Sequence, residues 1–351
     1  MSLTTHRVEF SGRAGTYFGI WIVNLLLSIL TIGIYSAWAK VRTQRYLNQN
    51  LTIDGRAFDY HATGLQILIG RIIVVAAFVA YSLLAAIPLF AVVLPIGLIF
   101  LIPWLLNRSL AFNARVTSFS GLRFGFDGSY WRAFRVYILY PVLAVFTLYL
   151  AFPFVARAVR SHVVNGHRFG TARFRFESGI GPFYKAFLMA GLWAVGTGLL
   201  LLALFAPLLA GFDPSAFRTG TGDPDPRQVL AALVPAAIIV LAILPAGFIY
   251  QAFIRNAVFA ATTLEGGHAF TSDIAPLRLV WIGVSNAVAV VFSLGLLLPW
   301  ARIRMIAYQA AHTHVTVNGS LDTFTAAEAE KVGAIGQAYT DIEGFDVGLP
   351  V

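Results

Sequence analysis

Cysteine is absent from the 351-residue sequence. The chain therefore cannot form a disulfide, present a thiolate nucleophile or ligate zinc or iron–sulfur centres through cysteine. Charged residues are also scarce, at 12% of the sequence, whereas a soluble protein usually has about 25%. Hydrophobic residues make up 58%, and the mean hydropathy is +0.76. This composition predicts an integral membrane protein.

The sequence motifs of common enzyme classes are also missing. There is no nucleophile elbow, Walker loop, dinucleotide fingerprint or HExxH. We therefore expect no catalytic residues, no enzymatic activity and no cofactor. His312 and His314 lie two residues apart, but no carboxylate is closer than Asp322, and zinc takes three or four ligands. No metal site is predicted, and two other pairs are expected to be solvated loop residues: Asp59 with His61, and His162 with His167.

Acidic residues do not occur in the long apolar runs. The polar residues there are amides and hydroxyls such as Asn24, Gln66 and Thr197. Carriers driven by protons or sodium commonly hold a buried carboxylate, so this absence disfavours a secondary transporter without excluding one. Arg71 is the one ionised side chain well inside an apolar stretch. It either snorkels to the membrane surface or has a functional role.

Three segments share one design, an apolar run that ends in a basic edge. They are Tyr17 to Arg45, Phe134 to Arg160, and Leu279 to Arg304. An interfacial tryptophan followed by Lys and Arg is typical of a membrane-inserted segment that meets the cytoplasmic surface. A short glycine-centred stretch follows each segment, and its β-branched residues before a turn predict a hairpin. These stretches are Leu51 to Gly55, Val163 to Gly166, and Val315 to Gly319.

The same order of features recurs along the chain. A short strand is expected before each segment, at His6 to Gly12, Arg123 to Gly128, and Gly267 to Thr271. One unit therefore consists of a strand, an apolar segment, a basic edge, a hairpin and a pair of membrane helices. We predict repeat units at residues 1–128 and 129–275, a partial third unit at 276–324, and a polar C-terminal tail at 325–351.

Four spanning helices are predicted, in two pairs. Leu65 to Leu106 is long enough for two spans of about 20 residues, with a break marked by Pro88 and Pro95. The second pair is Phe187 to Gly211 and Val229 to Ile254. The loop between them, Phe212 to Gln228, carries three aspartates, whereas the outer ends of both pairs carry Lys and Arg. The outer ends are therefore expected in the cytoplasm.

The three repeated segments leave two alternatives open, because each begins and ends beside basic residues. Either they are re-entrant, with bends near Thr31–Gly33, Tyr140–Pro141 and Ser293–Gly295, or they cross the membrane fully. Half of such a segment reaches only about 16 Å, half of a hydrocarbon core. The predicted fold is a mainly α-helical multi-pass membrane protein with four spanning helices, three re-entrant or spanning repeated segments, and a small cytoplasmic β-domain built from repeated hairpins.

At this point the sequence resembles a known family. The run from Phe18 to Tyr46, the stretch from Asp54 to Gly64, and Arg123 to Gly128 are similar to the YjgN-like family of bacterial inner-membrane proteins of unknown function. The resemblance spans most of the chain and is most specific in the first unit. It implies a multi-pass protein of the bacterial inner (cytoplasmic) membrane, and it supplies no catalytic residues.

The basic edges are the candidate site. The net charge is +9, but the cations flank apolar runs, so anionic lipid headgroups are the expected partner rather than nucleic acid. The alternative is that they only orient the chain. We expect a non-enzymatic lipid-interacting or membrane-organising protein; a transporter or channel for a small solute is the second hypothesis, and no protein partner is predicted. The candidate headgroup contacts are Trp38, Lys40, Arg42, Arg45, Arg71, Arg157, Arg160, Trp300, Arg302 and Arg304.

Overall fold

A computed structural model describes residues 3–210 and 226–343 of the chain. These residues form two compact units. The barrel unit comprises residues 3–179, 258–273 and 298–343, and the helix unit comprises 180–210, 226–257 and 274–297. Most of the expected acidic loop, up to Asp225, lies outside the described residues, and so do residues 344–351 of the expected tail.

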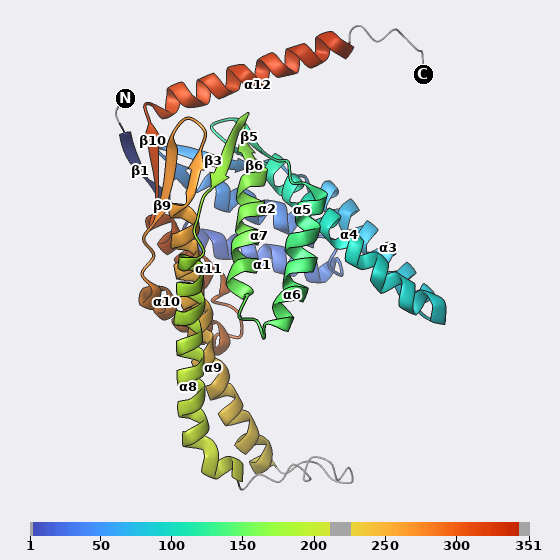
Figure 1. Cartoon of the computed structure of the whole chain (residues 1–351), viewed down its shortest axis with the longest axis vertical. Helices are drawn as coiled ribbons and strands as arrows, with labels where there is room; N and C mark the ends of the chain where they lie inside the picture. The colour runs from blue at the N-terminus through green and yellow to red at the C-terminus, as the bar shows by residue number, and fades with distance from the viewer. Residues whose placement is uncertain (1–2, 211–225, 344–351) are drawn as a thin grey trace. The chain divides into compact units, whose positions relative to one another are not determined.

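The barrel unit is built on a closed β-barrel rather than on separate hairpins (Figure 1). Sequential strands pair antiparallel, and the first strand closes the barrel by pairing with both the second and the tenth. The small β-domain of hairpins expected from the sequence is therefore wrong. The strands are β1 (Leu3–Phe10), β2 (Leu51–Ile53), β3 (Arg56–Tyr60), β4 (Thr117–Phe119), β5 (Leu122–Phe126), β6 (His167–Phe169), β7 (Ala172–Phe176), β8 (Thr262–Leu264), β9 (His268–Ser272) and β10 (Thr313–Asn318).

Closure of the barrel has a simple physical reason. Each hairpin consists of a three-residue and a five-residue strand, and a two-stranded hairpin is marginal alone in water. Pairing every strand on both sides removes the exposed edges that would otherwise promote aggregation. The longer strands β1 and β10 complete the ring, in a register that pairs Arg7 with His314 and Val8 with Ile53.

Two of the three predicted hairpin turns are misplaced. The first is correct, because Asp54 and Gly55 form a two-residue turn with φ of 52° and 71°, the conformation that favours Asp-Gly. The helix α7 (Phe152–Gly166) runs through the second predicted turn, and the real turn lies five residues later at Gly170–Thr171. The third prediction fails because β10 is a single strand that ends at Asn318.

The interior of the barrel is filled by aromatic side chains. Strands β3, β5, β7 and β9 each carry a phenylalanine at their central position, and neighbouring ring centroids lie 6.3, 6.5 and 5.8 Å apart around the barrel. These residues are Phe58, Phe124, Phe174 and Phe270. A cavity of about 80 Å³ remains among them and is lined by apolar side chains and His268. The barrel is therefore a packed core.

Helix α12 (Leu321–Glu343) packs against one end of the barrel (Figure 1). Phe324 from this helix lies over His268 and Phe169, with ring centroids 4.1 and 6.0 Å apart. His268 is buried, and burial lowers its pKa. The backbone N–H of Asn318 donates to His268 Nδ1 at 3.2 Å, so the ring is neutral. The segment expected as a polar tail thus contains a helix that contributes an aromatic ring to the barrel core.

The first apolar segment is a helical hairpin. Helix α1 (Ala14–Leu30) and helix α2 (Ser36–Gln49) pack together, and Asn24 Nδ2 donates to the carbonyl of Ala39 at 3.3 Å. Both ends return to neighbouring strands, since Phe10 pairs with Leu51 in the barrel. The bend at Thr31–Tyr35 lies where the re-entrant alternative requires one.

The second and third segments have the same order of helix, turn and helix. The second consists of α5 (Tyr130–Phe134), a π-helical turn η1 (Arg135–Leu139), α6 (Tyr140–Phe146) and α7. Its bend lies at Thr147–Ala151, so the prediction of a bend at Tyr140–Pro141 is wrong. Pro141 instead lies just after the π-helical turn, within an uninterrupted helical run over residues 130–146. The third consists of α10 (Pro276–Phe292) and α11 (Leu298–Ala311).

Four helices among the described residues are long and apolar enough to cross a membrane: Gly64–Leu84, Pro88–Arg115, Gly181–Phe205 and Ala242–Ala260. The first two are α3 (Gly64–Leu84) and α4 (Pro88–Arg115), and the others lie within α8 (Gly181–Ala210) and α9 (Pro226–Ala260). Thr63 and Gln66 form a capping box at the start of α3. Pro88 begins α4 as expected, but Pro95 lies inside that helix and does not break it.

Candidate functional site

The bends of the three helical hairpins are the most exposed apolar features of the described chain. We call them the tips: Thr31–Tyr35, Thr147–Ala151 and Ser293–Leu297. The second residue of each tip is aliphatic and almost fully exposed, at 94% for Ile32, 85% for Leu148 and 94% for Leu294. Their neighbours along the turn are also exposed and apolar. Side chains of this kind on a short bend are typical of a membrane-inserting element.

The three tips share one hydrogen-bond pattern. The first residue is Thr or Ser, and its hydroxyl accepts from the backbone N–H four residues later at 2.9, 3.0 and 3.0 Å. The N–H of the third residue donates to a carbonyl in the preceding helix at 2.7, 2.9 and 2.8 Å. These N–H groups are thus satisfied inside the chain, as hydrocarbon requires.

Glycine has a defined role at the third residue of two tips. Gly33 and Gly295 have φ of 86° and 90°, a region that residues with a Cβ rarely adopt. The second tip has Tyr149 there instead, at φ 62°. The preceding aliphatic residue is left-handed in every tip, with φ of 50°. A left-handed aliphatic residue is strained. Its presence in all three tips indicates that the bend serves to expose an apolar side chain.

The predicted basic residues follow the tips but are not all at equivalent positions. Lys40 and Arg42 lie nine and eleven residues after Thr31, and Arg302 and Arg304 lie at the same distances after Ser293. Trp38 and Trp300 each lie seven residues after the hydroxyl. In the second hairpin the cations are shifted, because Arg157 and Arg160 lie ten and thirteen residues after Thr147. Arg157 therefore lies on a different face of its helix from Lys40 and Arg302, whereas Arg160 lies four residues beyond their position and on nearly the same face.

The first and third basic edges lie along exposed surfaces. Lys40, Arg42 and Arg45 are exposed on α2, and Trp38 packs against the Cα of Gly64 at the start of α3. Arg71 on α3 donates to the hydroxyl of Ser36, at the start of α2. In the third hairpin, the guanidinium of Arg304 lies 5.1 Å from the ring of Trp300, a cation–π contact. Arg302 Nη1 donates to the hydroxyl of Tyr17 at 2.9 Å.

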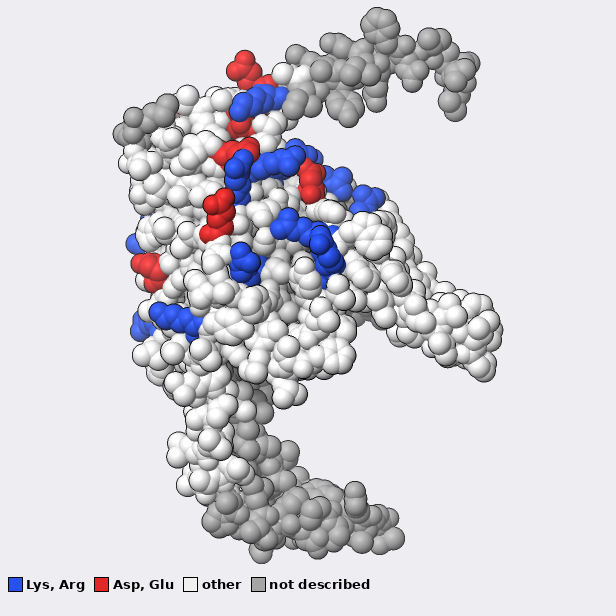
Figure 2. Space-filling view, in the orientation of Figure 1, with Lys and Arg blue, Asp and Glu red and all other residues white. Residues whose placement is uncertain are grey.

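The second hairpin places its cations around a groove. Arg132 and Arg135 on the outgoing helices and Arg157 on α7 line a cavity of about 330 Å³, together with Val136, Tyr140, Ala158 and Ser161. None of the lining residues is acidic. Figure 2 shows Lys and Arg side chains grouped over α5 and α7, with uncharged surface over α6 beside them. Arg132 and Arg135 were not among the predicted site residues.

An apolar groove continues from the arginine-lined cavity. It has a volume of about 410 Å³ and shares Tyr140, Arg157 and Ala158 with the first cavity. The remaining lining residues come from α6, α7 and the tip between them: Leu143, Ala144, Thr147, Ala151, Phe154 and Val155. The two cavities therefore form one groove between α6 and α7, with a cationic end and an apolar end.

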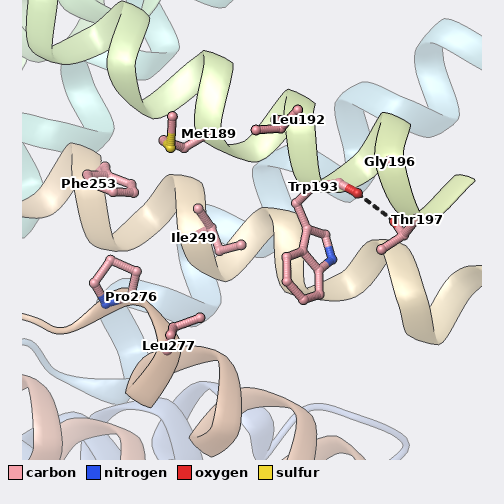
Figure 3. A pocket seen from close by; sticks show the side chains of 9 residues that line it. All are labelled: Met189, Leu192, Trp193, Gly196, Thr197, Ile249, Phe253, Pro276 and Leu277. Carbon is pink, nitrogen blue, oxygen red and sulfur yellow. Dashed lines mark hydrogen bonds between the residues drawn. The ribbon is translucent and has the colours of Figure 1, made fainter.

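The helix unit contains a separate apolar pocket (Figure 3). Its volume is about 520 Å³, and its lining comes from α8, α9 and α10, with Trp193, Ile249 and Leu277 among the residues that point into it. Trp193 Nε1 donates to the carbonyl of Ala242 at 2.9 Å, which fixes the indole between the two helices. No charged residue lines this pocket, so it offers no contact for a headgroup.

The histidines do not form a metal centre. No group of three or more potential ligands occurs in the part of the chain that the structure describes. His312 pairs with Asp273 at 3.0 Å, and His61 lies 3.9 Å from Asp59. The expectation that His162 is a solvated loop residue is wrong, because it is buried on α7 within 2.9 Å of Asn107 Oδ1.

Glu328 on α12 is the most buried carboxylate of the described residues. It accepts from the backbone N–H and hydroxyl of Thr171 at 2.9 and 2.6 Å, and from the N–H of Ala172 at 3.1 Å. Lys331 Nζ donates to its other oxygen at 2.7 Å. Burial by itself raises the pKa of Glu328, but the hydrogen bonds from Lys331 and Thr171 outweigh this effect and the pKa is lowered.

Comparisons with known proteins agree with the membrane character of the chain. Inner membrane protein YjgN of Salmonella typhimurium (strain LT2) is 27% identical over 380 residues, covering 93% of this chain and 92% of that protein. Inner membrane protein YjgN of Escherichia coli O157:H7 is 33% identical over 148 residues, covering 40% of this chain and 37% of that protein. No solved structure is significantly similar.

These relatives and the apolar helices establish an integral protein of the bacterial inner membrane, as the sequence predicts. The family described as bacterial protein of unknown function (DUF898) matches residues 5–342, nearly the whole chain. The match includes the barrel strands, both helix pairs and all three tips. The chain therefore belongs to the DUF898 family of bacterial proteins.

Proposed function

We propose that this protein is a non-enzymatic, lipid-interacting organiser of the inner membrane. The observation that carries the proposal is the design of the tips. Each presents an almost fully exposed aliphatic side chain and satisfies its turn N–H groups internally. A bend of this kind is costly in water and stable in hydrocarbon. The tips insert into one leaflet, and the cations that follow them contact anionic headgroups.

The location of the barrel follows from this arrangement. Both ends of each hairpin lie at barrel strands, so a hairpin that enters one leaflet leaves the barrel on the side from which it entered. Lys40, Arg42 and Arg45 then face the cytoplasm by the positive-inside rule. We propose that the closed barrel lies on the cytoplasmic face.

The repeat organisation is part of the same proposal. In each hairpin, 20 residues separate the tip hydroxyl from the first residue of the returning strand. The equal spacing and the shared hydrogen bonds favour repeat units at 1–128 and 129–275 and a partial unit at 276–324, followed by residues 325–351. Three insertions from one chain would anchor the barrel more firmly than one, because apolar burial is roughly additive.

A transporter or channel for a small solute is less well supported. The barrel interior is packed with phenylalanine rings, and the cavity that remains is about 80 Å³, too small for a continuous water path. Solute flux across proteoliposomes that contain the protein would support this alternative directly.

The lipid interaction can be tested with variants of the first basic edge. The purified full-length protein and its Arg42→Gln/Arg45→Gln variant are compared by native mass spectrometry for bound phosphatidylglycerol. Arg123→Gln, an exposed change on β5, is the matched control. We expect fewer bound anionic lipids in the double variant only. Equal binding in all three proteins would contradict a role of this edge in lipid contact.

The cytoplasmic location can be tested separately, because the chain has no native cysteine. Single cysteines at Ala57, Thr263 and Ala326, all exposed on the barrel or on α12, serve as reporters. An impermeant maleimide should label them only after the inner membrane is opened. Labelling of any of them from the periplasmic side of intact cells would overturn the proposed location.

A further inference from the structure

We propose that the groove between α6 and α7 is a specific binding site for one anionic phospholipid. This inference rests on the proposed lipid interaction and assigns it to one site. Arg132, Arg135 and Arg157 hold the phosphate at one end. An acyl chain lies in the apolar end that leads to the tip at Thr147 and Ala151.

The cationic end has the chemistry that a phosphate needs. Guanidinium groups donate several N–H bonds in a fixed geometry and remain charged at any physiological pH. Among the described residues, none of the three arginines forms a salt bridge. Two of them are oriented by neutral partners, since Arg132 donates to the hydroxyl of Ser161 at 2.9 Å and Arg157 to the carbonyl of Ser178 at 2.7 Å. Their positive charge is therefore not neutralised by any described residue.

The second helical hairpin differs from the other two at the residue ten positions after the tip hydroxyl, which lines the groove. Ten residues after the tip hydroxyl, the first and third hairpins have Val41 and Ile303, which are 8% and 7% exposed. The second hairpin has the exposed Arg157 there. Val41 packs against Tyr60, Ala62 and Ile67, and Ile303 packs against Tyr17 and Leu47. The arginine at this position lines the groove instead, so this cation is a feature of the second hairpin alone.

The π-helical turn contributes to the same site. In an α-helix, residues five apart point about 140° away from each other. The N–H of Tyr140 instead bonds the carbonyl of Arg135, which brings residues five apart close to one line along the helix. Arg135, Val136 and Tyr140 consequently all line the groove. Single π turns inside α-helices occur frequently at functional sites.

The apolar end favours a lipid over a free phosphate ester. Its lining includes Leu143, Phe154 and Val155, and it extends from the arginines toward a tip whose Leu148 is 85% exposed. Inorganic phosphate would contact only the cationic end. A phospholipid places its charged and apolar parts at the two ends in the order in which the groove presents them.

The test uses the full-length protein in detergent, with phosphatidylglycerol and phosphatidylcholine as probes, and measures the affinity of the bound lipid by native mass spectrometry. Arg132→Gln/Arg135→Gln should weaken phosphatidylglycerol binding about tenfold or more, because charge-assisted hydrogen bonds are lost. Ala158→Trp, which fills the groove without removing a charge, should have the same effect. Arg123→Gln, which removes a charge at an exposed position on β5 outside the groove, is the control.

The outcomes distinguish the site from the general proposal. Loss of binding in both groove variants, but not in Arg123→Gln, supports the site. If only Arg42→Gln/Arg45→Gln loses lipid, the groove proposal is overturned while the proposed function stands. If no variant of either set loses lipid, both fail. Displacement of the bound lipid by excess inorganic phosphate, or equal affinity for phosphatidylcholine, would contradict recognition of an anionic phospholipid as a whole.

Discussion

Glu328 on α12 accepts two hydrogen bonds from Thr171, 157 residues earlier in the chain, at the turn of the β6–β7 hairpin. The carboxylate satisfies the turn N–H groups and joins the helix to the end of the barrel. Gly170 lies beside it, and a Cβ at that position would come within 3.1 Å of Glu328 Oε2. The Glu328 carboxylate therefore packs closely against the backbone of the turn.

Removal of this carboxylate should release α12 from the barrel. Glu328→Ala removes the acceptor of the Thr171 N–H and hydroxyl, which costs about 1–3 kcal/mol for a buried donor. We expect faster amide hydrogen exchange along α12 and at the β6–β7 turn. Glu330→Ala, at an exposed position on the same helix, should leave exchange unchanged. Equal exchange in the two variants would show that Glu328 does not hold the helix.

The same contact should weaken in acid. The pKa of Glu328 is lower in the folded protein than its ordinary value, which is about 4.3 in an unfolded chain. Its contribution to stability is therefore complete above about pH 4.3 and is lost as the pH falls through the lowered pKa of the folded state. Exchange along α12 in the native protein should approach that of Glu328→Gln as the pH falls below 4.3. A constant difference between the two proteins across this range would contradict the coupling.

The membrane helices could be predicted from the sequence because their signal is local. Long uncharged runs are visible in any window of the length of a span, and both helix pairs lie close to their expected positions. Proline was less informative. Pro88 begins a helix and Pro95 lies within one, because a proline inside a helix is tolerated where neighbouring groups compensate for the lost hydrogen bond.

The closed barrel could not be predicted from the hairpin signals alone. Its strands are three to eight residues long, and the pairing of β1 with β10 joins residues about 300 positions apart. A signal was nevertheless present. The central residue is phenylalanine in all four longer hairpin strands, read as RAFDY, LRFGF, ARFRF and HAFTS. Four copies of one inward aromatic residue indicate a shared core rather than independent hairpins.

The cationic groove was missed for a different reason. Apart from Arg71, the cations of the predicted site follow an apolar run, a pattern that marks the cytoplasmic edge of a membrane segment. Arg132 and Arg135 precede their apolar run. They reach the same surface as Arg157 only because the hairpin folds back. The sequence pattern did not indicate that this segment bends at Thr147 rather than at Pro141.

The aromatic core of the barrel should be sensitive to truncation. Phe169 is 4% exposed and lies between Phe119, Phe124 and Phe324, with ring centroids 6.2, 5.2 and 6.0 Å away. We expect Phe169→Ala to lower the free energy of unfolding by about 3–5 kcal/mol, measured by denaturant titration of the purified protein. Leu3→Ala, at a position 68% exposed on β1, should change it by less than about 0.5 kcal/mol. Similar effects of the two changes would show that the barrel interior does not act as a core.

Leu148 provides a direct test of tip insertion. Its backbone conformation is compatible with an aspartate, whereas a side chain in hydrocarbon must be apolar. Its φ of 50° is left-handed, a conformation that Asp adopts more readily than Leu. Leu148→Asp should therefore preserve the backbone of the tip, and in a detergent micelle, whose core is smaller and more deformable than a bilayer, the aspartate stays hydrated. In a bilayer, an aspartate near the centre of the hydrocarbon core costs about 2.5–3.5 kcal/mol.

The variant should consequently be destabilised in lipid vesicles and not in micelles, as measured by denaturant titration in both. Leu3→Asp on the barrel is the matched control, since it adds the same charge at an exposed aliphatic position outside the tips. We expect the Leu3→Asp variant to be equally stable in vesicles and in micelles. If Leu148→Asp also unfolds equally in vesicles and micelles, the tip does not enter the leaflet. The barrel must then be held at the membrane by its spanning helices alone.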